Sequence, residues 1–297
     1  VSMLKEYEFK DRVMGTNFIV SLVAGNEEAA LGGYRQALGI AQAYESRFSR
    51  FLNKSELTEL NDKKDLVVSE IFWDVFSIAE NLYKETNAIF NPLLQIESLG
   101  YKKDFALMDK NIGDRGVVCY DVKWDSLLSE KNKKRICLGP GQKLDFGGFL
   151  KGYVAEEIAN TLKYNFTGVI VNIGGDIFTH GEDENGKPFT FSVFNPITQK
   201  ELSDILVKNE SIATSGTYKR KWNVSGKEVF HILDTNKLDN PDTDLISAAV
   251  IAPHGAIAEA YATVAICIGK ERATELLDKK HFRYILIDKN GRVFKNT

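Results

Sequence analysis

The sequence predicts an α+β fold, because segments typical of helices and segments typical of strands follow one another without a regular strand–helix–strand repeat. Near the N-terminus a predicted strand pair precedes a long amphipathic helix, whereas most of the second half has the apolar pattern of strands. A doubly wound parallel sheet would need strands and helices to alternate throughout. With 297 residues, 43% of them apolar and 27% charged, the chain has a globular composition and enough length for a substantial core.

Helices are predicted where apolar residues recur at spacings of three and four. They cover residues 27–48, 69–86, 148–163, 256–269 and 270–279. In the first helix, the residues expected to face inward are Leu31, Tyr34, Leu38, Ala41, Tyr44 and Phe48. In the second, which Ser69 is expected to cap, they are Ile71, Phe72, Val75, Ile78 and Leu82. The polar stretch between these two helices, residues 49–65, is expected to be irregular.

Strands are predicted from alternating apolar residues and from clusters of β-branched residues. Two of them lie within residues 7–23 and are joined by a turn at Met14-Gly15-Thr16. The others cover residues 168–173, 177–180, 189–194, 203–207, 211–213, 228–233, 245–252, 282–288 and 292–294. Residues 87–143 show no clear period, and no repeat or linker divides the chain. We therefore expect one compact unit over residues 1–297, or two subdomains packed closely against each other.

Charge and cysteine content argue against several classes of protein. The formal net charge is −3, from 38 basic and 41 acidic residues, and the basic residues are scattered, so no nucleic-acid surface is expected. Cys119, Cys137 and Cys267 lie far apart and form no zinc-like pattern. The longest apolar run, residues 256–269, is interrupted by Glu259 and is shorter than the roughly 18 residues that a membrane-spanning helix needs.

Two glycine-rich segments could bring the backbone close to a ligand. In Asp145-Phe-Gly-Gly-Phe-Leu-Lys151-Gly152-Tyr153, two glycines precede a predicted helix whose first amide groups attract anions, and Lys151 adds a positive charge. In Asn172-Ile-Gly-Gly-Asp176, the glycine pair predicts a tight turn between two strands. Each segment also has a purely structural interpretation, as a helix start or as a β-turn.

Two further residues are candidates for phosphate chemistry. Ser215 ends a small, hydroxyl-rich segment that could donate hydrogen bonds to phosphate oxygens, although a polar turn explains it equally well. His231 lies in a predicted strand, on the same face as Val229 and Leu233. It could be a general base, a phosphate contact or a hydrogen-bonded packing residue.

The sharpest local signal is a carboxylate on an otherwise apolar helix. Glu259 and Thr263 are four residues apart and therefore share a helix face. Burying a carboxylate is costly unless it is paired or binds a cation, so a position at the solvent edge is the alternative. A carboxylate and a hydroxyl together are oxygen ligands of the kind that Mg²⁺ accepts.

The ordered series of these segments resembles the ApbE family, the FAD:protein FMN transferases. Eight motifs of that family have counterparts here, in family order. They are Met14-Gly15-Thr16, the stretch from Phe51 through Ser55-Glu56-Leu57 to Asn61, Phe90-Asn91-Pro92, Asp145 to Tyr153, Asn172 to Asp176, Thr214 to Gly216, His231 to Asp234 and Ala258 to Thr263. Each motif is weak alone, but the ordered set covers nearly the whole chain.

This resemblance implies a fold and a reaction. The fold would be the family's compact α+β unit, sometimes described as two subdomains with FAD in the cleft between them. The implied enzyme uses FAD and Mg²⁺. The hydroxyl of a Thr or Ser in an acceptor flavoprotein attacks the FMN-side phosphorus of FAD, AMP leaves, and FMN stays esterified to the acceptor.

The resemblance also implies roles for individual residues. Glu259, Thr263 and the backbone carbonyl of Leu150 would hold Mg²⁺. His231 would be the base for the acceptor hydroxyl, and Lys151 would neutralise the pyrophosphate. Gly174, Gly175 and Ser215 would position that pyrophosphate. The residues lining FAD would be Met14, Phe51, Ile89, Phe90, Asn91, Gly147, Lys151, Tyr153 and Ile232.

Three positions depart from the family pattern. Glu259 and Asn91 stand where the family usually has Asp, and Thr235 stands where it usually has Pro. Two alternatives stay open, and the first two departures are the reason for the second of them. One is a Mg²⁺-dependent hydrolase that splits FAD into FMN and AMP. The other is a protein that binds or delivers FAD without turnover.

The location in the cell is expected from the resemblance alone. Members of this family commonly act outside the cytoplasm, often as lipid-anchored proteins. The resemblance therefore implies an extracytoplasmic location, which allows a lipid anchor upstream of Val1, with a cytoplasmic location as the alternative.

Overall fold

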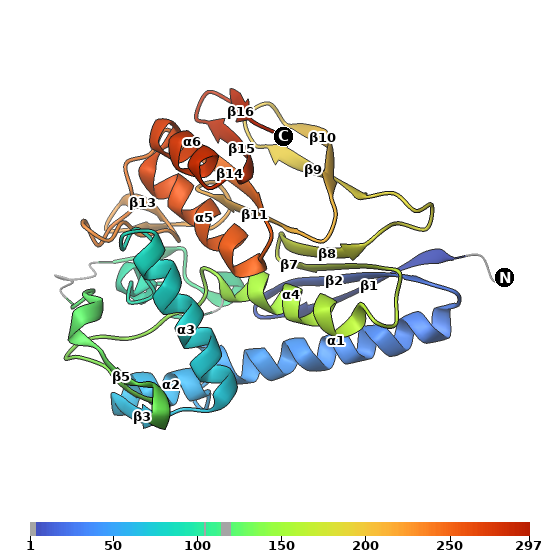
Figure 1. The fold of residues 1–297 in the computed structure, drawn as a ribbon. Coiled ribbons are helices and arrows are strands. Elements are labelled where there is room, and N and C mark those ends of the chain that lie inside the picture. Colours follow the sequence, from blue (N-terminus) through green and yellow to red (C-terminus); the bar gives the residue numbers. More distant parts are fainter. Residues whose placement is uncertain (1–3, 104, 114–119) are drawn as a thin grey trace. The chain divides into compact units, whose positions relative to one another are not determined.

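The first of two compact units contains an antiparallel sheet of eight strands (Figure 1). The structure is a computed structural model, and it describes residues 4–103, 105–113 and 120–297. Cys119 lies outside the described residues. This first unit consists of residues 4–45, 149–216 and 243–297. In spatial order its strands are β1 (Lys5–Val13), β2 (Thr16–Ala24), β7 (Gly168–Ile173), β8 (Asp176–Gly181), β11 (Ser211–Gly216), β14 (Leu245–Ala252), β15 (Arg283–Asp288) and β16 (Val293–Lys295). The antiparallel sheet with its helices confirms the predicted α+β class.

Helices and a hairpin cover opposite faces of this sheet. The helices are α4 (Leu150–Leu162), α5 (Gly255–Ile268) and α6 (Lys270–Lys279), and the hairpin consists of β9 (Phe189–Asn195) and β10 (Lys200–Val207). Helix α4 packs on β7 and β8, and α5 packs on β11 and β14 (Figure 1). Ile212 and Ile251 contact the hairpin, whereas the next residues along each strand, Ala213 and Ala252, contact α5. Because successive side chains of a strand point to opposite faces, the two layers lie on opposite sides.

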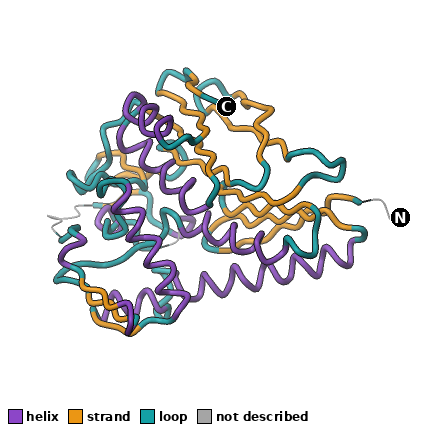
Figure 2. Tube along the Cα trace, viewed as in Figure 1, coloured by secondary structure: helices purple, strands orange, loops and turns teal. Residues whose placement is uncertain are grey.

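Helix α1 (Glu27–Phe48) lies along β1 and β2 as one continuous helix (Figure 2). Its end points match the prediction. The predicted buried face is confirmed for Ala41 and Phe48, whereas the other four predicted residues are only half-buried. Most of the buried positions are small residues, and three of them, Ala30, Gly33 and Ala37, were not predicted. A Cβ atom on Gly33 would overlap the ring of Phe166, so small residues let the helix approach the sheet closely.

Helices α4 and α5 cross at two glycines, and each helix caps the other. A Cβ atom on Gly152 would overlap the backbone of Gly255, and a Cβ atom on Gly255 would overlap that of Gly152. Glu156 of α4 accepts a hydrogen bond from the Gly255 amide at 2.8 Å. In return, Glu259 of α5 accepts one from the Gly152 amide at 2.8 Å. Carboxylates at these first-turn amides also complement the helix dipoles.

The second unit consists of residues 46–148 and 217–242. Its helices are α2 (Glu56–Lys63) and α3 (Glu70–Glu85), with short 3₁₀ helices η1 (Ile96–Leu99), η2 (Phe105–Leu107), η3 (Trp124–Ser126) and η4 (Lys131–Lys133). One small sheet contains β3 (Asp65–Val67), β6 (Arg135–Cys137) and β5 (Leu128–Glu130), and another contains β13 (Lys227–Phe230), β12 (Lys221–Val224) and β4 (Asn111–Ile112). Trp222 is buried beside Leu99 and Tyr101 and donates its indole N–H to the Leu99 carbonyl at 2.7 Å.

Two predictions about the helices of this unit were wrong. Residues 49–65 were expected to be irregular but contain α2, whose first turn is capped by the Ser55 hydroxyl accepting from the Thr58 amide at 3.0 Å. Ile71 was expected to face inward, yet its side chain is 43% exposed, because the buried face of α3 is formed by Phe72, Val75 and their neighbours. The prediction that Ser69 caps α3 is confirmed.

Among the described residues, none of the helices combines the length and the apolar character that a membrane span requires.

The helix crossing gives a test of this packing. We expect Gly152→Ala to lower the free energy of unfolding by about 2 kcal/mol or more, because the new methyl group meets backbone that cannot rotate away. Gly39→Ala on α1 is the matched control: nothing lies within 4 Å of the point that its Cβ atom would occupy, so a gain of about 0.5–1 kcal/mol is expected. Urea denaturation measures both. Equal stability of the two variants would contradict the close crossing.

Candidate functional site

The first unit contains a buried cluster of one ammonium and two carboxylates. Lys151, the second residue of α4, places its Nζ atom 2.8 Å from Oδ2 of Asp176 and also pairs with Oε1 of Glu259. The exposed fractions of the three side chains are 15%, 6% and 5%. The prediction that Glu259 needs a partner is confirmed, and its alternative position at the solvent edge is wrong.

The second oxygen of Glu259 is also occupied. Oε2 accepts the hydrogen bond from the Gly152 amide, which is one of the first-turn groups that the sequence predicted to attract an anion. The anion that this amide attracts is therefore a side chain of the protein itself. The helix crossing makes this contact possible, since Gly152 and Glu259 are 107 residues apart in sequence.

Burial and charge act in opposite directions on these groups. Burial raises the pKa of the Glu259 carboxyl to about 7, and the neighbouring Asp176 charge raises it too, whereas Lys151 and the Gly152 amide lower it. For Lys151, burial lowers the pKa, but the charges of Asp176 and Glu259 outweigh burial and raise the pKa above its usual value. The ammonium is therefore charged at neutral pH, and this one cation contacts both acidic side chains.

Two hairpin turns lie at the end of the sheet where this cluster is found. Met14 and Gly15 form the two-residue turn between β1 and β2, both with positive φ angles of 53° and 69°. Gly174 and Gly175 form the corresponding turn between β7 and β8, immediately before Asp176. The turns are adjacent, because the Gly174 amide donates to the Asn17 carbonyl at 2.9 Å.

Hydroxyl groups approach the same end of the sheet. Strand β11 pairs with β8 so that Ile212 lies opposite Ile177, which carries Ser215 toward the glycine turn. The Ser215 and Thr263 hydroxyl oxygens are 3.0 Å apart. Thr263 follows Glu259 by one helical turn on α5, as predicted. The structure thus brings together predicted site residues from α4, α5, β11 and two turns.

The oxygen atoms near Glu259 are of the type that magnesium binds. Carboxylates, a hydroxyl and the carbonyl of Leu150 are all hard oxygen ligands, which is the type that Mg²⁺ prefers. In the part of the chain that the structure describes, no three His, Cys, Asp or Glu side chains are grouped as a metal would require. The donors near Glu259 fit Mg²⁺ because they are oxygen atoms of the type that this ion prefers. In this structure, the cation that contacts Glu259 is the Lys151 ammonium.

Other predicted residues lie in the second unit, around an arginine that the sequence analysis did not single out. The Arg50 guanidinium lies 4.2 Å from the ring centroid of Phe51 and 4.8 Å from that of Tyr101. Its Nε atom is 3.2 Å from Oδ2 of Asp145, whose other oxygen accepts from the Gly147 amide at 2.8 Å. Arg50 therefore ties Phe51 to the glycine-rich segment before α4.

Asn91 and Thr235, two of the departures from the family pattern, have local explanations. The Asn91 side chain is buried and donates to the Val122 carbonyl at 2.9 Å while accepting from the Leu93 amide at 2.9 Å. An aspartate could not donate the first of these bonds. The Thr235 hydroxyl donates to the Ala88 carbonyl at 2.8 Å, next to the predicted site residues Ile89 and Phe90.

The predicted setting of His231 was wrong. Strand β13 ends at Phe230, so His231 follows the strand and does not share a strand face with Val229 and Leu233. The physical reason is Asn240, whose side chain donates to the carbonyls of Phe230 and Ile232 and accepts from the Phe230 amide. The Asn240 side chain thus forms the hydrogen bonds that a neighbouring strand would otherwise form with this backbone. His231 is half-buried and Ile232 is buried.

Asp176 appears in the glycine motif, but the sequence analysis assigned it no role. An acidic residue directly after a glycine turn and before an apolar strand was a signal that could have identified it.

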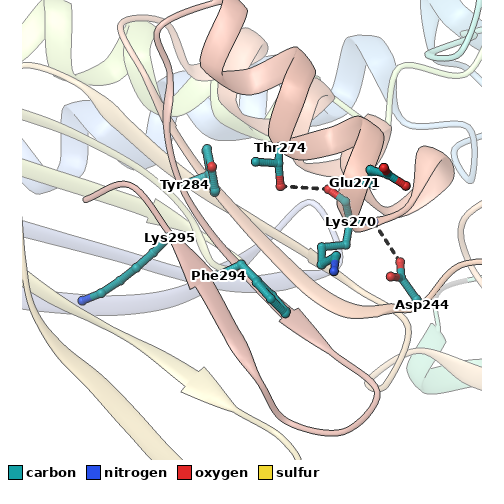
Figure 3. A pocket seen from close by; sticks show the side chains of 7 residues that line it. All are labelled: Asp244, Lys270, Glu271, Thr274, Tyr284, Phe294 and Lys295. Carbon is teal, nitrogen blue, oxygen red and sulfur yellow. Dashed lines mark hydrogen bonds between the residues drawn. The ribbon is translucent and has the colours of Figure 1, made fainter.

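A pocket of about 710 Å³ lies elsewhere in the first unit (Figure 3). Its lining contains none of the predicted site residues and consists of Asp244, Lys270, Glu271, Thr274, Tyr284, Phe294 and Lys295.

Asn91 provides a test of this geometry. We expect Asn91→Asp, which installs the usual family residue, to lower the free energy of unfolding by about 1–3 kcal/mol, because the Val122 carbonyl loses its donor and faces a carboxylate. The matched control is Asn26→Asp at the start of α1. Asn26 is exposed and uses its oxygen to accept from the Ala29 amide, a bond that aspartate preserves. Chemical denaturation should separate the two; identical effects would refute the role of the Asn91 donor.

Comparison with known proteins gives a consistent picture. The model of the ApbE family matches residues 14–286. A FAD:protein FMN transferase of Klebsiella pneumoniae is 23% identical over 96% of this chain and 90% of its own length, and one of Haemophilus influenzae is 24% identical over 99% and 90%. The crystal structure of the ApbE protein from Thermotoga maritima superposes with a TM-score of 0.86 at 21% identity, covering 98% of this chain and 97% of its own. The flavin transferase ApbE of Vibrio cholerae gives 0.81 at 18% identity, covering 99% and 98%.

Proposed function

The chain belongs to the ApbE family, and from this we propose that it transfers the FMN part of FAD to a Thr or Ser hydroxyl of an acceptor flavoprotein, with Mg²⁺ as the metal and AMP as the second product. The observation that carries this proposal is the buried cluster of Lys151, Asp176 and Glu259 beside the Gly174-Gly175 turn. A protein that moves a doubly charged pyrophosphate needs such an arrangement of cations, oxygen ligands and exposed backbone amides.

The first unit supplies the residues that would handle charge. Glu259, Thr263 and the Leu150 carbonyl would hold Mg²⁺, which when bound neutralises phosphate oxygens and stabilises the charge that develops on them. Lys151 adds a second positive charge on the same side. The Gly174-Gly175 turn and the Ser215 hydroxyl offer hydrogen-bond donors that fix the orientation of the pyrophosphate.

The covalent step breaks the phosphoanhydride bond of FAD and forms a phosphoester bond to the acceptor. The hydroxyl oxygen of the acceptor forms a bond to the FMN-side phosphorus, and the bond from that phosphorus to the oxygen bridging the two phosphates breaks. The bridging oxygen leaves as part of AMP. His231 accepts the proton of the acceptor hydroxyl. In-line positioning and charge neutralisation carry most of the catalysis in such a reaction, so the base has a smaller share.

The departures from the family pattern are compatible with this chemistry. Glu259 has one more methylene than aspartate, and the structure uses the added length to reach both Lys151 and the Gly152 amide. Asn91 uses its amide to hold the loop that contains Ile89 and Phe90. Neither change removes an oxygen ligand from the first unit.

The proposal predicts that the purified full chain, given FAD and Mg²⁺, releases AMP and adds one FMN mass to a peptide of the family's acceptor pattern, Asp-x-x-Thr-Gly-Ala-Thr. EDTA should abolish both products, because the metal neutralises the pyrophosphate. Mass spectrometry of peptide and nucleotide is the measurement.

The controls separate the alternatives. A peptide with Ala in place of the acceptor Thr should receive no FMN. AMP formed without an adduct on any acceptor would indicate FAD hydrolysis. Bound FAD with no AMP would replace the transferase by a carrier of FAD.

The role of His231 gives a second prediction. His231→Ala should leave the dissociation constant of FAD nearly unchanged while the transfer rate falls by about 100-fold or more, because the acceptor hydroxyl loses its base. FAD binding can be followed by quenching of flavin fluorescence, and transfer by the peptide assay. Loss of FAD binding in this variant would make His231 a ligand contact or a folding residue instead of the base.

A further inference from the structure

In the first unit, one ammonium contacts two buried acidic side chains. In the proposed function, one of these side chains, Glu259, would also bind a metal. Lys151 contacts both Asp176 and Glu259, and the three side chains are at least 85% buried. Glu259 cannot give Oε1 to Lys151 and to a divalent ion at the same time, since both cations would be buried within a few ångströms of each other. One of the two contacts must therefore be exchanged when a metal binds.

The geometry shows which contacts can persist. Oε2 of Glu259 is fixed by the Gly152 amide, so the carboxylate stays in place while Oε1 changes partner. Asp176 is the first residue of β8, directly after a two-residue turn, and its carboxylate is 6% exposed. Lysine carries its charge on a flexible four-carbon stem, so the ammonium can leave Glu259 and remain at Asp176 without movement of α4.

We propose that Lys151 is the resident cation of this site in the metal-free protein, that Mg²⁺ displaces its ammonium from Glu259, and that Asp176 retains it next to the metal. The identity of the metal rests on the proposed function. Asp176 is then a positioning residue: it acts through Lys151, and it keeps the second positive charge where the pyrophosphate arrives. Metal-free protein in turn avoids two unpaired buried carboxylates.

The test is calorimetric titration of Mg²⁺ into the FAD-free full chain. Lys151→Met should bind Mg²⁺ about tenfold more tightly than the unaltered protein, because the competing ammonium is gone. Lys151→Arg keeps a charge between the carboxylates and should bind Mg²⁺ no more tightly. Lys163→Met, at the other end of α4, is the matched control and should bind as the unaltered protein does.

Asp176 is tested through a double-mutant cycle. Asp176→Asn should weaken Mg²⁺ binding, because Lys151 then has only Glu259 as a partner and competes more strongly. In the Lys151→Met background the same substitution should have a much smaller effect, since there is no ammonium to retain. An undiminished effect would mean that Asp176 does not act through Lys151, and would overturn its assignment as a positioning residue.

Thermal unfolding provides a readout that does not depend on activity. Without Mg²⁺, Lys151→Met should have a lower Tm than the unaltered protein, and Mg²⁺ should raise the Tm of the variant by more, as its tighter binding requires. If Lys151→Met does not fold, Lys151→Gln takes its place, because the amide can donate a hydrogen bond to each carboxylate without carrying charge.

The outcomes distinguish this inference from the proposed function. Normal Mg²⁺ binding by the unaltered protein with no tighter binding in Lys151→Met or Lys151→Gln overturns only the exchange of cations. No Mg²⁺ binding by the unaltered protein but clear binding by Lys151→Met would show that the ammonium blocks the metal, and would overturn its displacement by Mg²⁺. No binding by either protein overturns both the inference and the metal assignment.

Discussion

The crossing of α4 and α5 at Gly152 and Gly255 is the constraint on which the site in the first unit depends. Only because neither glycine has a Cβ can the two backbones come close enough for Glu259 to reach the Gly152 amide. The same approach lets Glu156 reach the amide of Gly255. Each helix therefore supplies the carboxylate that the other helix start needs, and the crossing places Lys151 beside Glu259.

This packing brings three charged or acidic side chains together in a nearly buried cluster. Two acidic side chains share one ammonium in a place that is almost closed to water. A site in this condition is suited to a second cation, and a site with a metal and a lysine is suited to a pyrophosphate. Structural pairing and proposed catalysis thus use the same three side chains in different combinations.

In the loops of the second unit, side chains form hydrogen bonds with backbone groups that strands would pair in a regular sheet. Asn91 and Asn240 each satisfy backbone groups in loops, Thr235 bonds the Ala88 carbonyl, and Arg50 joins Phe51 to Asp145. Loops held by specific polar contacts can keep aromatic and apolar side chains at defined positions without extended strands. This explains why residues 87–143 show no periodic pattern and yet carry predicted site residues.

The sequence alone determined the features that depend on local pattern: the bounds of α1 and α6, the strands of the large sheet, the glycine turn at residues 174–175 and the ordered motifs of the ApbE family. It also required a partner for a carboxylate on an apolar helix. It missed α2, the small buried residues of α1 and the end of β13, since these depend on one cap, on close packing against a sheet and on the side chain of Asn240. Tertiary structure alone decided that the partners of Glu259 are Lys151 and Gly152, because these residues lie over a hundred positions away and meet only where two helices cross through glycine.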